Sequence, residues 1–236
     1  MKLGIIGAME IEVAALKENM ENKSEKTVAG SVYVEGTLEG LPVVIVQCGV
    51  GKVNAALCVQ VLCDCFQVTH IVNTGVAGSL NAELDIGDFV ISKEAVYHDF
   101  DCSTINPKYA LGQVPGMEIV AFPSDDLLIR LASAAAKAHC SGRAHIGIVA
   151  TGDQFVASKE QKERIIQNTN ALCTEMEGAA ISQAAFRNGI PVVVIRAISD
   201  KADNTAWMDY AYFEAIAARQ GTEVVRSMAK SLSTMQ

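Results

Sequence analysis

The sequence predicts an α/β fold in which a central, mixed and mostly parallel β-sheet is flanked by helices. Continuous apolar runs rich in β-branched residues alternate along the chain with amphipathic stretches, as expected for strands buried on both faces between helices. The chain has 236 residues, of which 50% are hydrophobic and 19% are charged. This length and composition are typical of one well-packed unit, so we expect residues 1–236 to form a single domain.

The first part of the chain begins this alternation. Residues 3–8 form an apolar run that predicts a buried strand, and residues 10–20 carry apolar side chains at helical spacing. Residues 31–38 and 42–47 have strand character on either side of a Glu-Gly pair, which predicts two paired strands joined by a tight turn. Residues 52–66 return to helical spacing and predict a second helix.

The middle of the chain continues the pattern. Residues 70–73 predict a short strand that enters a glycine-rich loop, and residues 89–97 predict another strand. Residues 125–139 are rich in alanine and predict a helix, and residues 145–150 predict a strand. The longest irregular stretch is at residues 99–123, and long loops in compact domains usually serve as lids or interface segments.

The last part of the chain completes the fold. Residues 159–167 and 178–188 predict helices, the second of which is ended by a Gly-Ile-Pro segment. Residues 192–198 form an apolar strand interrupted only by Arg196. Residues 210–232 predict a long closing helix.

The charge pattern excludes several classes of partner. The net charge is -8, and lysine and arginine do not cluster, which argues against binding to nucleic acid or to a membrane surface. No apolar run is long enough to cross a membrane. The apolar N-terminal run is too short for a signal peptide and is followed directly by Glu10 and Glu12.

The cysteines do not form a recognisable framework. Their number is odd and their spacing irregular, so we expect no disulfide set. Cys63 and Cys65 are too close together for a usual zinc pair, and no second pair follows. We therefore expect no metal site and no cofactor, and we expect most cysteines to act as small apolar side chains in the reducing cytoplasm. The seven are Cys48, Cys58, Cys63, Cys65, Cys102, Cys140 and Cys173.

Three glycine-containing segments are candidate ligand loops. Residues 4–9 lack the third glycine and the distant acidic residue of a dinucleotide fingerprint. Residues 48–54 do not have the spacing of a phosphate-binding P-loop. Residues 73–80 are small, which would let a ligand approach the backbone closely. Each segment is also compatible with a plain turn between a strand and a helix.

Three carboxylates follow strand ends, where ligands bind in α/β sheets. Glu12 comes just after the first strand, Glu177 opens the helix at 178–188, and Asp200 ends the last apolar strand. Taken singly, the glutamates are equally explained as charges favoured in the first turn of a helix, and Arg196 as a member of a structural ion pair. Three such carboxylates in one sheet form a more specific pattern, which predicts a catalytic site.

The chain resembles a known enzyme family over nearly its whole length. The matching segments, in order, are GIIGAMEIEV, GVGKVNAAL, NTGVAGSL, YHDFD, TGDQF, EMEGAA and RAISDKAD. They are similar to those of the 5′-methylthioadenosine/S-adenosylhomocysteine nucleosidases, within the purine nucleoside phosphorylase/hydrolase superfamily. The resemblance implies a nucleoside phosphorylase-like fold, hydrolytic release of adenine, and a homodimer in which residues 102–115 complete the partner's pocket.

The resemblance also implies a role for individual residues. Glu12 is expected to activate the attacking water, and Asp200 to protonate the leaving adenine at N7. Glu177 is expected to hold the ribose hydroxyls, while Phe155 stacks on the base and backbone groups of Phe155 and Val156 read its edge. The other residues expected at the substrate or water site are Ala8, Met9, Val50, Val76, Glu175, Met176, Arg196, Ser199, Ala202 and Tyr210, with Ile105 and Pro115 acting on the partner's pocket.

The implied chemistry suits paired carboxylates. Cleavage of the glycosidic bond builds positive charge on the ribose and negative charge on the base, so one ionised and one protonated carboxyl meet both needs. The chain departs from the family at Val76, where the family usually has serine, and at residues 105–107, which lack the commoner aromatic pattern. These departures leave the preferred 5′-substituent open.

Three other functions remain to be separated from this one. A nucleoside phosphorylase of the same fold would need a cationic cradle for phosphate, whereas the first turn here presents Glu10 and Glu12. A futalosine-type hydrolase shares the fold and the water chemistry. A nucleoside-binding sensor without turnover would not need to retain Glu12, Glu177 and Asp200.

Overall fold

The computed structural model describes residues 1–139, 143–204 and 206–235, so Cys140 lies outside the described residues. The strands are β1 (Leu3–Gly7), β2 (Glu21–Val28), β3 (Ser31–Leu38), β4 (Leu41–Gln47), β5 (His70–Ser79), β6 (Phe89–Tyr97), β7 (Ala121–Pro123), β8 (Ala144–Thr151), β9 (Cys173–Glu175) and β10 (Val192–Asp200). The helices are α1 (Glu10–Glu18), α2 (Lys52–Phe66), α3 (Asp126–His139), α4 (Lys159–Thr169), α5 (Gly178–Asn188) and α6 (Ala206–Ser233).

The strands form one mixed sheet that closes on itself in the middle. β1 pairs in parallel with both β4 and β5, and β3 and β2 extend the β4 edge as antiparallel neighbours. β10 pairs with both β5 and β6, and the order β5, β9, β8, β6 and β10 therefore forms a closed ring. At one end of this ring Gly78 of β5 is the neighbour of Asp200 on β10 and of Thr174 on β9.

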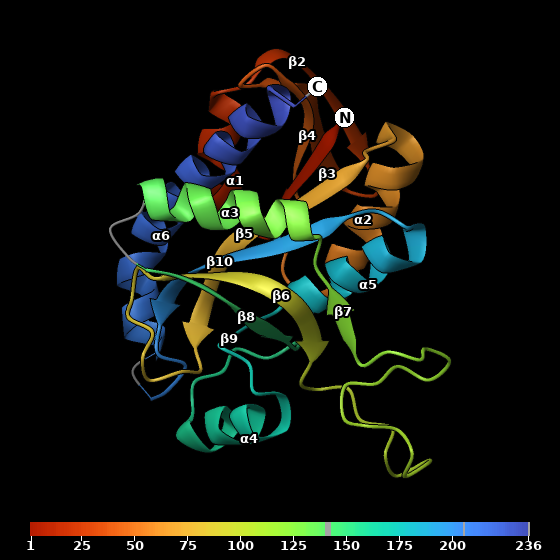
Figure 1. Ribbon diagram of the computed structural model, residues 1–236, viewed down its shortest axis with the longest axis vertical. Helices are drawn as coiled ribbons and strands as arrows, with labels where there is room; N and C mark the ends of the chain where they lie inside the picture. The colour runs from red at the N-terminus through yellow and green to blue at the C-terminus, as the bar shows by residue number, and fades with distance from the viewer. Residues whose placement is uncertain (140–142, 205, 236) are drawn as a thin grey trace.

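Helices cover both faces of the sheet (Figure 1). Ile5 of β1 packs in a core cluster with side chains of α1, α3 and α6, while the next residue, Ile6, packs in a second cluster with α2 and α5. Because both faces are buried, the central strands read as unbroken apolar runs rather than as alternating patterns. The predicted α/β fold with a mixed sheet flanked by helices is therefore confirmed.

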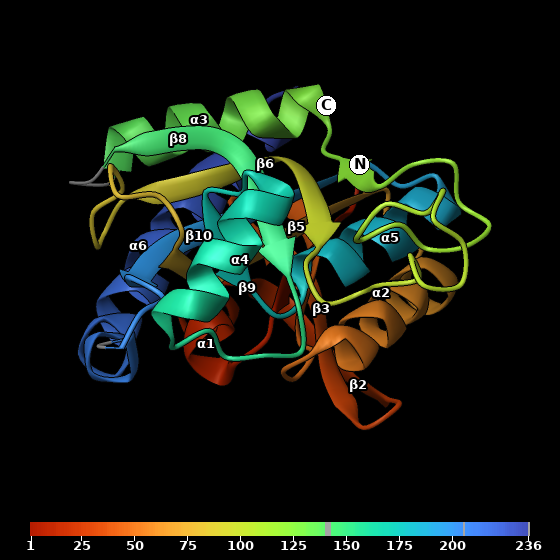
Figure 2. The ribbon, with the colours of Figure 1, turned by 90° about the horizontal axis from the view of Figure 1, so that it is seen from below.

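Two segments lie apart from these layers. The two termini lie close together at one end of the molecule, and α4 lies at the opposite end (Figure 1). The irregular segment between β6 and β7 stands out from the body beside α2 and α5 (Figure 2). None of the helices in the described part of the chain has the length and apolar character needed to span a bilayer.

The elements differ from the prediction at several places, among them β7, a short strand inside the stretch that was predicted to be irregular. The residues predicted as a glycine-rich loop after residue 73 are strand, because β5 continues to Ser79. β2 was not predicted, since its sequence ENKSEKTV is exposed along an edge of the sheet and has no apolar face. α6 begins at Ala206, four residues before the predicted start at residue 210. The predicted turn between β3 and β4 is present, with φ of 51° at Glu39 and 79° at Gly40, as the tight hairpin turn requires.

Candidate active site

A cavity of about 250 Å³ lies where the turns after β1 and β4 meet the ends of β5, β9 and β10. Its shape is concave and its lining is mainly apolar with a few convergent polar groups, as is usual for small-molecule sites. The lining residues are Ala8, Met9, Glu12, Val50, Val76, Ala77, Gly78, Gln154, Phe155, Val156, Thr174, Glu175, Met176, Glu177, Ser199, Asp200 and Tyr210. The three carboxylates singled out from the sequence, Glu12, Glu177 and Asp200, thus share one cavity.

Glu12 is held rigidly by the backbone around it. Its Oε2 accepts hydrogen bonds from the N–H groups of Ala8 at 2.7 Å and Met9 at 3.0 Å, and its Oε1 accepts from Val76 at 3.1 Å. Burial raises the pKa of Glu12 above its ordinary value, against the lowering effects of Arg196 and of the three N–H donors. A fixed carboxylate with a raised pKa is well suited to accept a proton from water.

Small residues in β5 make room for these carboxylates. A Cβ on Gly78 would lie 2.7 Å from Asp200 Oδ1 and 2.9 Å from the Cβ of Ala202. Glycine is thus required in this strand because side chains of the protein itself approach the backbone, and not only to admit a ligand. The sequence analysis predicted the approach of a ligand here, and that stays a prediction; the groups that the structure places against Gly78 are Asp200 and Ala202.

Arg196 lies behind the cavity and is only 1% exposed. Its Nη2 donates to Asn73 Oδ1 at 2.6 Å and forms an ion pair with Glu175, and it lies 3.9 Å from Glu177 Oε2. The predicted need for a polar partner is therefore met by Glu175. This buried cation stabilises the ionised forms of the surrounding glutamates.

Glu177 is the residue before α5 and lines the cavity. Its Oε1 accepts a hydrogen bond from Gly51 N–H at 2.9 Å, while its Oε2 faces Arg196. Burial and the neighbouring Glu175 raise the pKa of Glu177, whereas Arg196 and the Gly51 N–H lower it. An anchored carboxylate at a helix start can accept hydrogen bonds from two vicinal hydroxyls.

Asp200 ends β10 and is 3% exposed. Its Oδ1 accepts from Ala202 N–H at 2.8 Å, and its Oδ2 accepts from the Ser199 hydroxyl at 2.9 Å. Burial raises its pKa, and these two hydrogen bonds act in the opposite direction. A buried aspartic acid that keeps its proton more readily can serve as a general acid.

Aromatic and thioether groups complete the wall. Phe155 is half-exposed and meets the ring of Tyr210 edge-on, with ring centroids 5.8 Å apart. The Tyr210 hydroxyl lies 3.1 Å from the Met9 sulfur. Val50 is exposed at the cavity rim, and Val156 is buried.

Four of the predicted site residues do not line this cavity. Arg196 and Ala202 lie behind it and act on the carboxylates that do. Ile105 is 80% exposed on the segment between β6 and β7, and Pro115 is also exposed. The second pair was predicted for the partner's pocket, which a single protomer does not test.

Four lining residues were not predicted as site residues. They are Ala77, Gly78, Gln154 and Thr174. The segments singled out in the sequence contain or adjoin all four, because NTGVAGSL contains the first two, TGDQF contains the third, and Thr174 directly precedes EMEGAA. The sequence therefore pointed to the right segments. Within each segment, uncharged residues gave no reason to predict one position rather than its neighbour as part of the cavity lining.

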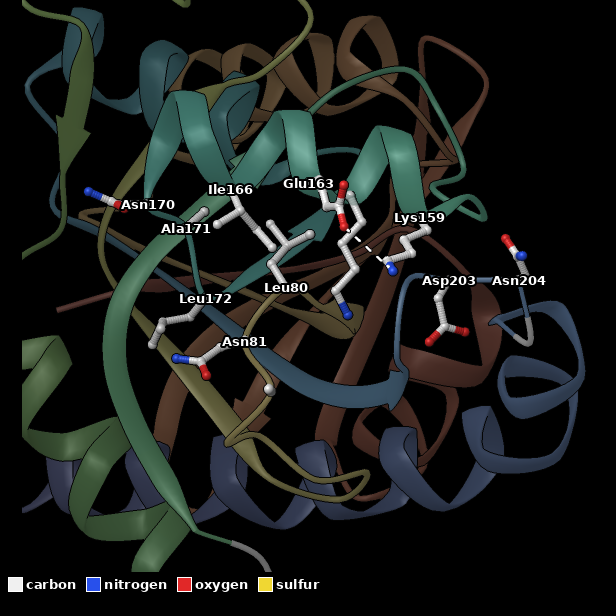
Figure 3. Close-up of a pocket in the computed structure, with 12 residues that line it drawn as sticks. Leu80, Asn81, Lys159, Glu163, Ile166, Asn170, Ala171, Leu172, Asp203 and Asn204 are labelled. Carbon is white, nitrogen blue, oxygen red and sulfur yellow. Dashed lines mark ion pairs between the residues drawn. The ribbon is translucent and has the colours of Figure 1, made fainter.

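A second, larger hollow of about 750 Å³ lies between α4 and the segments at 80–82 and 203–204 (Figure 3). Lys159 and Glu163 point into it and pair with each other at 3.8 Å. The hollow holds neither Glu12 nor Glu177, so we assign the chemistry to the smaller cavity. Among the described residues, no group of three or more His, Cys, Asp or Glu side chains is arranged to hold a metal ion.

Comparison with known proteins agrees with this geometry. The sequence profile of the phosphorylase superfamily matches residues 2–230. The 5′-methylthioadenosine/S-adenosylhomocysteine nucleosidase of Geobacillus thermodenitrificans (strain NG80-2) is 41% identical over 229 residues, which cover 97% of this chain and 96% of that protein. The crystal structure of the nucleosidase of that name from Colwellia psychrerythraea 34H, in complex with adenine, is 40% identical with a TM-score of 0.93 and covers 98% of this chain and 96% of its own.

A related hydrolase is more distant in sequence. The futalosine hydrolase of Helicobacter pylori strain 26695 is 31% identical with a TM-score of 0.91, over 98% of each chain. Both the superfamily profile and the close relatives span almost all of this chain. The chain therefore belongs to the 5′-methylthioadenosine/S-adenosylhomocysteine nucleosidase family of the phosphorylase superfamily.

Proposed function

We propose that this enzyme hydrolyses the N-glycosidic bond of 5′-methylthioadenosine and S-adenosylhomocysteine, releasing adenine and the thioribose. The observation that carries the proposal is the presence of Glu12, Glu177 and Asp200 in one cavity, held by different elements of the fold. The names of the relatives agree with this substrate class. We further propose that the chain forms a single domain, since the superfamily profile runs from residue 2 to residue 230.

Asp200 serves the base. Its raised pKa favours the protonated carboxylic acid, which can donate to N7 as negative charge develops on the leaving adenine. Phe155 offers a ring face for stacking, and the backbone of Phe155 and Val156 offers hydrogen bonds to the base edge. Ala202 and Ser199 act through Asp200, because both donate to its carboxyl oxygens.

Glu12 activates the attacking water, and Glu177 binds the ribose. Three N–H donors fix the Glu12 carboxylate but leave one of its roughly four lone-pair sites free to accept from a water molecule. Glu177 accepts from the ribose hydroxyls and, as an anion, stabilises the positive charge that builds on the sugar. Behind the cavity, Arg196 pairs with Glu175 and lies 3.9 Å from Glu177 Oε2.

The remaining lining residues surround the sugar and the 5′-substituent. Ala8, Met9, Val50 and Met176 present small or apolar surface to the thioribose. Val76 places a methyl-bearing side chain where a serine hydroxyl is usual in the family, so Glu12 serves the water site without that hydroxyl. Tyr210 also lines the cavity, with its hydroxyl 3.1 Å from the Met9 sulfur.

Water, rather than phosphate, is the expected acceptor of the sugar. The cavity lining, all of it in the described part of the chain, includes no lysine or arginine. A phosphate dianion would need such cations and would be repelled by Glu12 and Glu177. The neighbouring cation, Arg196, is already bonded to Asn73 and Glu175.

The substrate range is tested with a panel. Purified enzyme is incubated with methylthioadenosine, S-adenosylhomocysteine, 5′-deoxyadenosine, inosine and a futalosine-type nucleoside, and base release is followed by chromatography. We expect the two thioadenosines to have the highest kcat/KM. A preference for the futalosine-type substrate by tenfold or more, on the order of 1.4 kcal/mol, would assign the chain to the other hydrolase.

The proposed assembly is a homodimer in which residues 102–115 of each protomer close the pocket of the other. Ile105 is exposed on this segment, and Val53 and Leu57 are exposed four residues apart on one face of α2. Exposed apolar side chains on a segment that stands out from the body beside α2 suit a mutual interface (Figure 2). Light scattering should give twice the monomer mass, and a fully active monomer would contradict the shared pocket.

A reducing compartment, the cytoplasm, is the proposed location. The cysteines in the described part of the chain, Cys48, Cys58, Cys63, Cys65, Cys102 and Cys173, are all unpaired, and three of them are buried. Unpaired cysteines are typical of proteins kept in a reducing environment.

A further inference from the structure

Three charged side chains that the proposed chemistry does not use meet beside the cavity. Lys52 Nζ lies 2.8 Å from Asp99 Oδ1 and 2.7 Å from Asp99 Oδ2. Asp99 Oδ2 also accepts the Asp153 N–H at 2.8 Å, and Asp153 Oδ1 accepts the Lys52 N–H at 2.8 Å. The Lys52 ammonium lies a further 3.7 Å from Asp153 Oδ2, which closes the Lys52–Asp99–Asp153 cluster.

The cluster joins three segments that are far apart in the sequence. Lys52 is the first residue of α2, Asp99 follows β6, and Asp153 follows β8. Each belongs to a different one of the segments that carried the family resemblance, namely GVGKVNAAL, YHDFD and TGDQF. The Lys52 and Asp99 side chains are 22% and 13% exposed, so this pair is screened from water more than a typical surface ion pair.

Residues next to the cluster line the cavity from two sides. On one side, Val50 lies at the cavity rim, and Gly51 donates its N–H to Glu177 Oε1 at 2.9 Å. On the other side, Asp153 is followed directly by residues 154–156, which form the wall assigned to the base. The turn before α2 packs closely against Asp153, because a Cβ on Gly51 would lie 3.1 Å from Asp153 Oδ1. Gly51 also has a φ of 97°, which favours glycine.

We propose that the Lys52–Asp99–Asp153 cluster is a positioning device that locks the ribose-binding turn at 50–51 to the base-binding segment at 154–156. The cluster thereby sets the distance between the Gly51 N–H, which donates to Glu177, and residues 154–156, which contact the adenine base. The inference rests on the proposed function, because that function assigns Glu177 to the ribose. It adds three positioning residues, none of which touches the substrate.

The cluster also influences the pKa of Glu177 through the Gly51 N–H. This carboxyl faces Glu175, Glu12, the Cys48 thiol and the Arg196 guanidinium, and burial raises its pKa while the Gly51 N–H lowers it. If the turn loosens and this hydrogen bond is lost, the pKa of Glu177 should rise further. The ionised form that binds the hydroxyls would then be lost at a higher pH, and the acid limb of the kcat/KM profile would move upward.

The test compares Lys52→Met and Asp99→Asn with matched controls in the full-length enzyme. Arg226 and Glu39 form an ion pair at 2.6 Å with similar exposure, 32% and 26%, at the turn before β4, whereas the cavity lies beyond the other end of that strand. Arg226→Met and Glu39→Gln therefore remove a comparable pair that lies far from the site. Kinetics with methylthioadenosine, the pH profile and the melting temperature are measured for all four variants.

We expect both cluster variants to lower kcat/KM by about tenfold or more, mainly through KM, because losing a charge-assisted hydrogen bond has effects of this order. Their acid limb should move to higher pH, while the control variants keep the wild-type kinetics and pH profile. Cluster variants that lose melting temperature as the controls do, but keep KM and the acid limb, would show a purely structural role and overturn the inference.

A second pair of variants keeps the test decisive if the first pair folds poorly. Asp153→Asn retains an oxygen that can accept the Lys52 N–H, whereas Asp153→Ala removes it, and the side chain is half-exposed. We expect a smaller KM effect for Asp153→Asn than for Asp153→Ala, and equal effects would contradict the lock. If the wild type cleaves no methylthioadenosine, the proposed function fails by itself, and the same comparison is made by calorimetry with adenosine as the ligand.

Discussion

Gly75 in β5 lies directly against the Glu12 carboxylate, so that a Cβ at position 75 would stand 2.6 Å from Glu12 Oε1. The same Cβ would lie 3.4 Å from Arg196 Nη1. Strand β5 therefore has a glycine at the position where the carboxylate of Glu12, the proposed general base, packs against its backbone. Because Glu12 is held by three N–H groups, it has little freedom to move aside.

Gly75→Ala should therefore damage turnover more than folding. The added methyl must displace the Glu12 carboxylate, and a misplacement of a catalytic group by about 1 Å can cost about 10²-fold. Gly4→Ala in β1 is the matched control, since its Cβ meets the flexible end of Leu62 at 3.1 Å. Steady-state kinetics and thermal melting are compared for both variants, and a Gly75→Ala enzyme with wild-type kcat would contradict the placement of the base.

Glu12→Gln should bind substrate but turn it over slowly. Glutamine keeps the size of the side chain, but its amide cannot accept a proton from water, and its NH₂ group must face at least one of the three N–H donors. We expect kcat to fall by about 10²–10⁴-fold while the dissociation constant for a bound nucleoside changes far less. Rapid-quench kinetics with calorimetric binding separates the two, and unchanged turnover per bound complex would rule out the assigned role.

Asp200→Asn should lose turnover and relax the choice of base. Asparagine retains an oxygen for the Ala202 N–H, but it has no acidic proton to give to N7. We expect a loss of about 10²-fold or more with methylthioadenosine, and improved relative activity on methylthioinosine because the amide can pair with a 6-oxo group. Both substrates are tested on both proteins, and near-normal turnover of the adenine substrate would remove Asp200 as the general acid.

The same variant should stabilise the protein at neutral and alkaline pH. Burial raises the pKa of Asp200 in the folded state, so its contribution to stability is complete below the unfolded pKa and is lost as pH rises through the folded pKa. Asparagine avoids the buried charge and still pairs with Ala202 and Ser199. Melting curves between about pH 4 and pH 8 should show that the melting temperature of the variant increases relative to that of the wild type as pH rises. A wild type that is the more stable at the alkaline end would contradict the raised pKa.

Much of the fold follows from local sequence patterns. Strands such as β1 and β10, and helices such as α2 and α5, are buried on defined faces, so their apolar spacing predicts them. β2 has no apolar face because it lies on an exposed edge of the sheet, and its pairing with β3 is set by the chain reversal at Ala29 and Gly30. Spacing alone could not find such a strand.

The site residues, too, include some that sequence patterns predict and others that only the strand pairing reveals. Glu12, Glu177 and Asp200 could be chosen because all three follow strand ends, where ligands bind in α/β sheets, and because the family resemblance implied a role for each. Gly78 and Thr174 could not, since their place depends on the pairing of β9 with β5, which brings two distant segments together. The extension of β5 through Gly75 was likewise hidden, because glycines in a strand look like a loop until the side chains that press on them are known.

The central claim is that water takes the sugar, and the acceptor can be measured directly. Methylthioadenosine is cleaved in isotopically labelled water, with and without phosphate, and the sugar product is analysed by mass spectrometry. We expect free methylthioribose carrying one labelled oxygen, formed at the same rate in both buffers, because Glu12 activates water and the described cavity lining holds no lysine or arginine for phosphate. A sugar 1-phosphate as the main product in phosphate buffer would contradict the account at its centre.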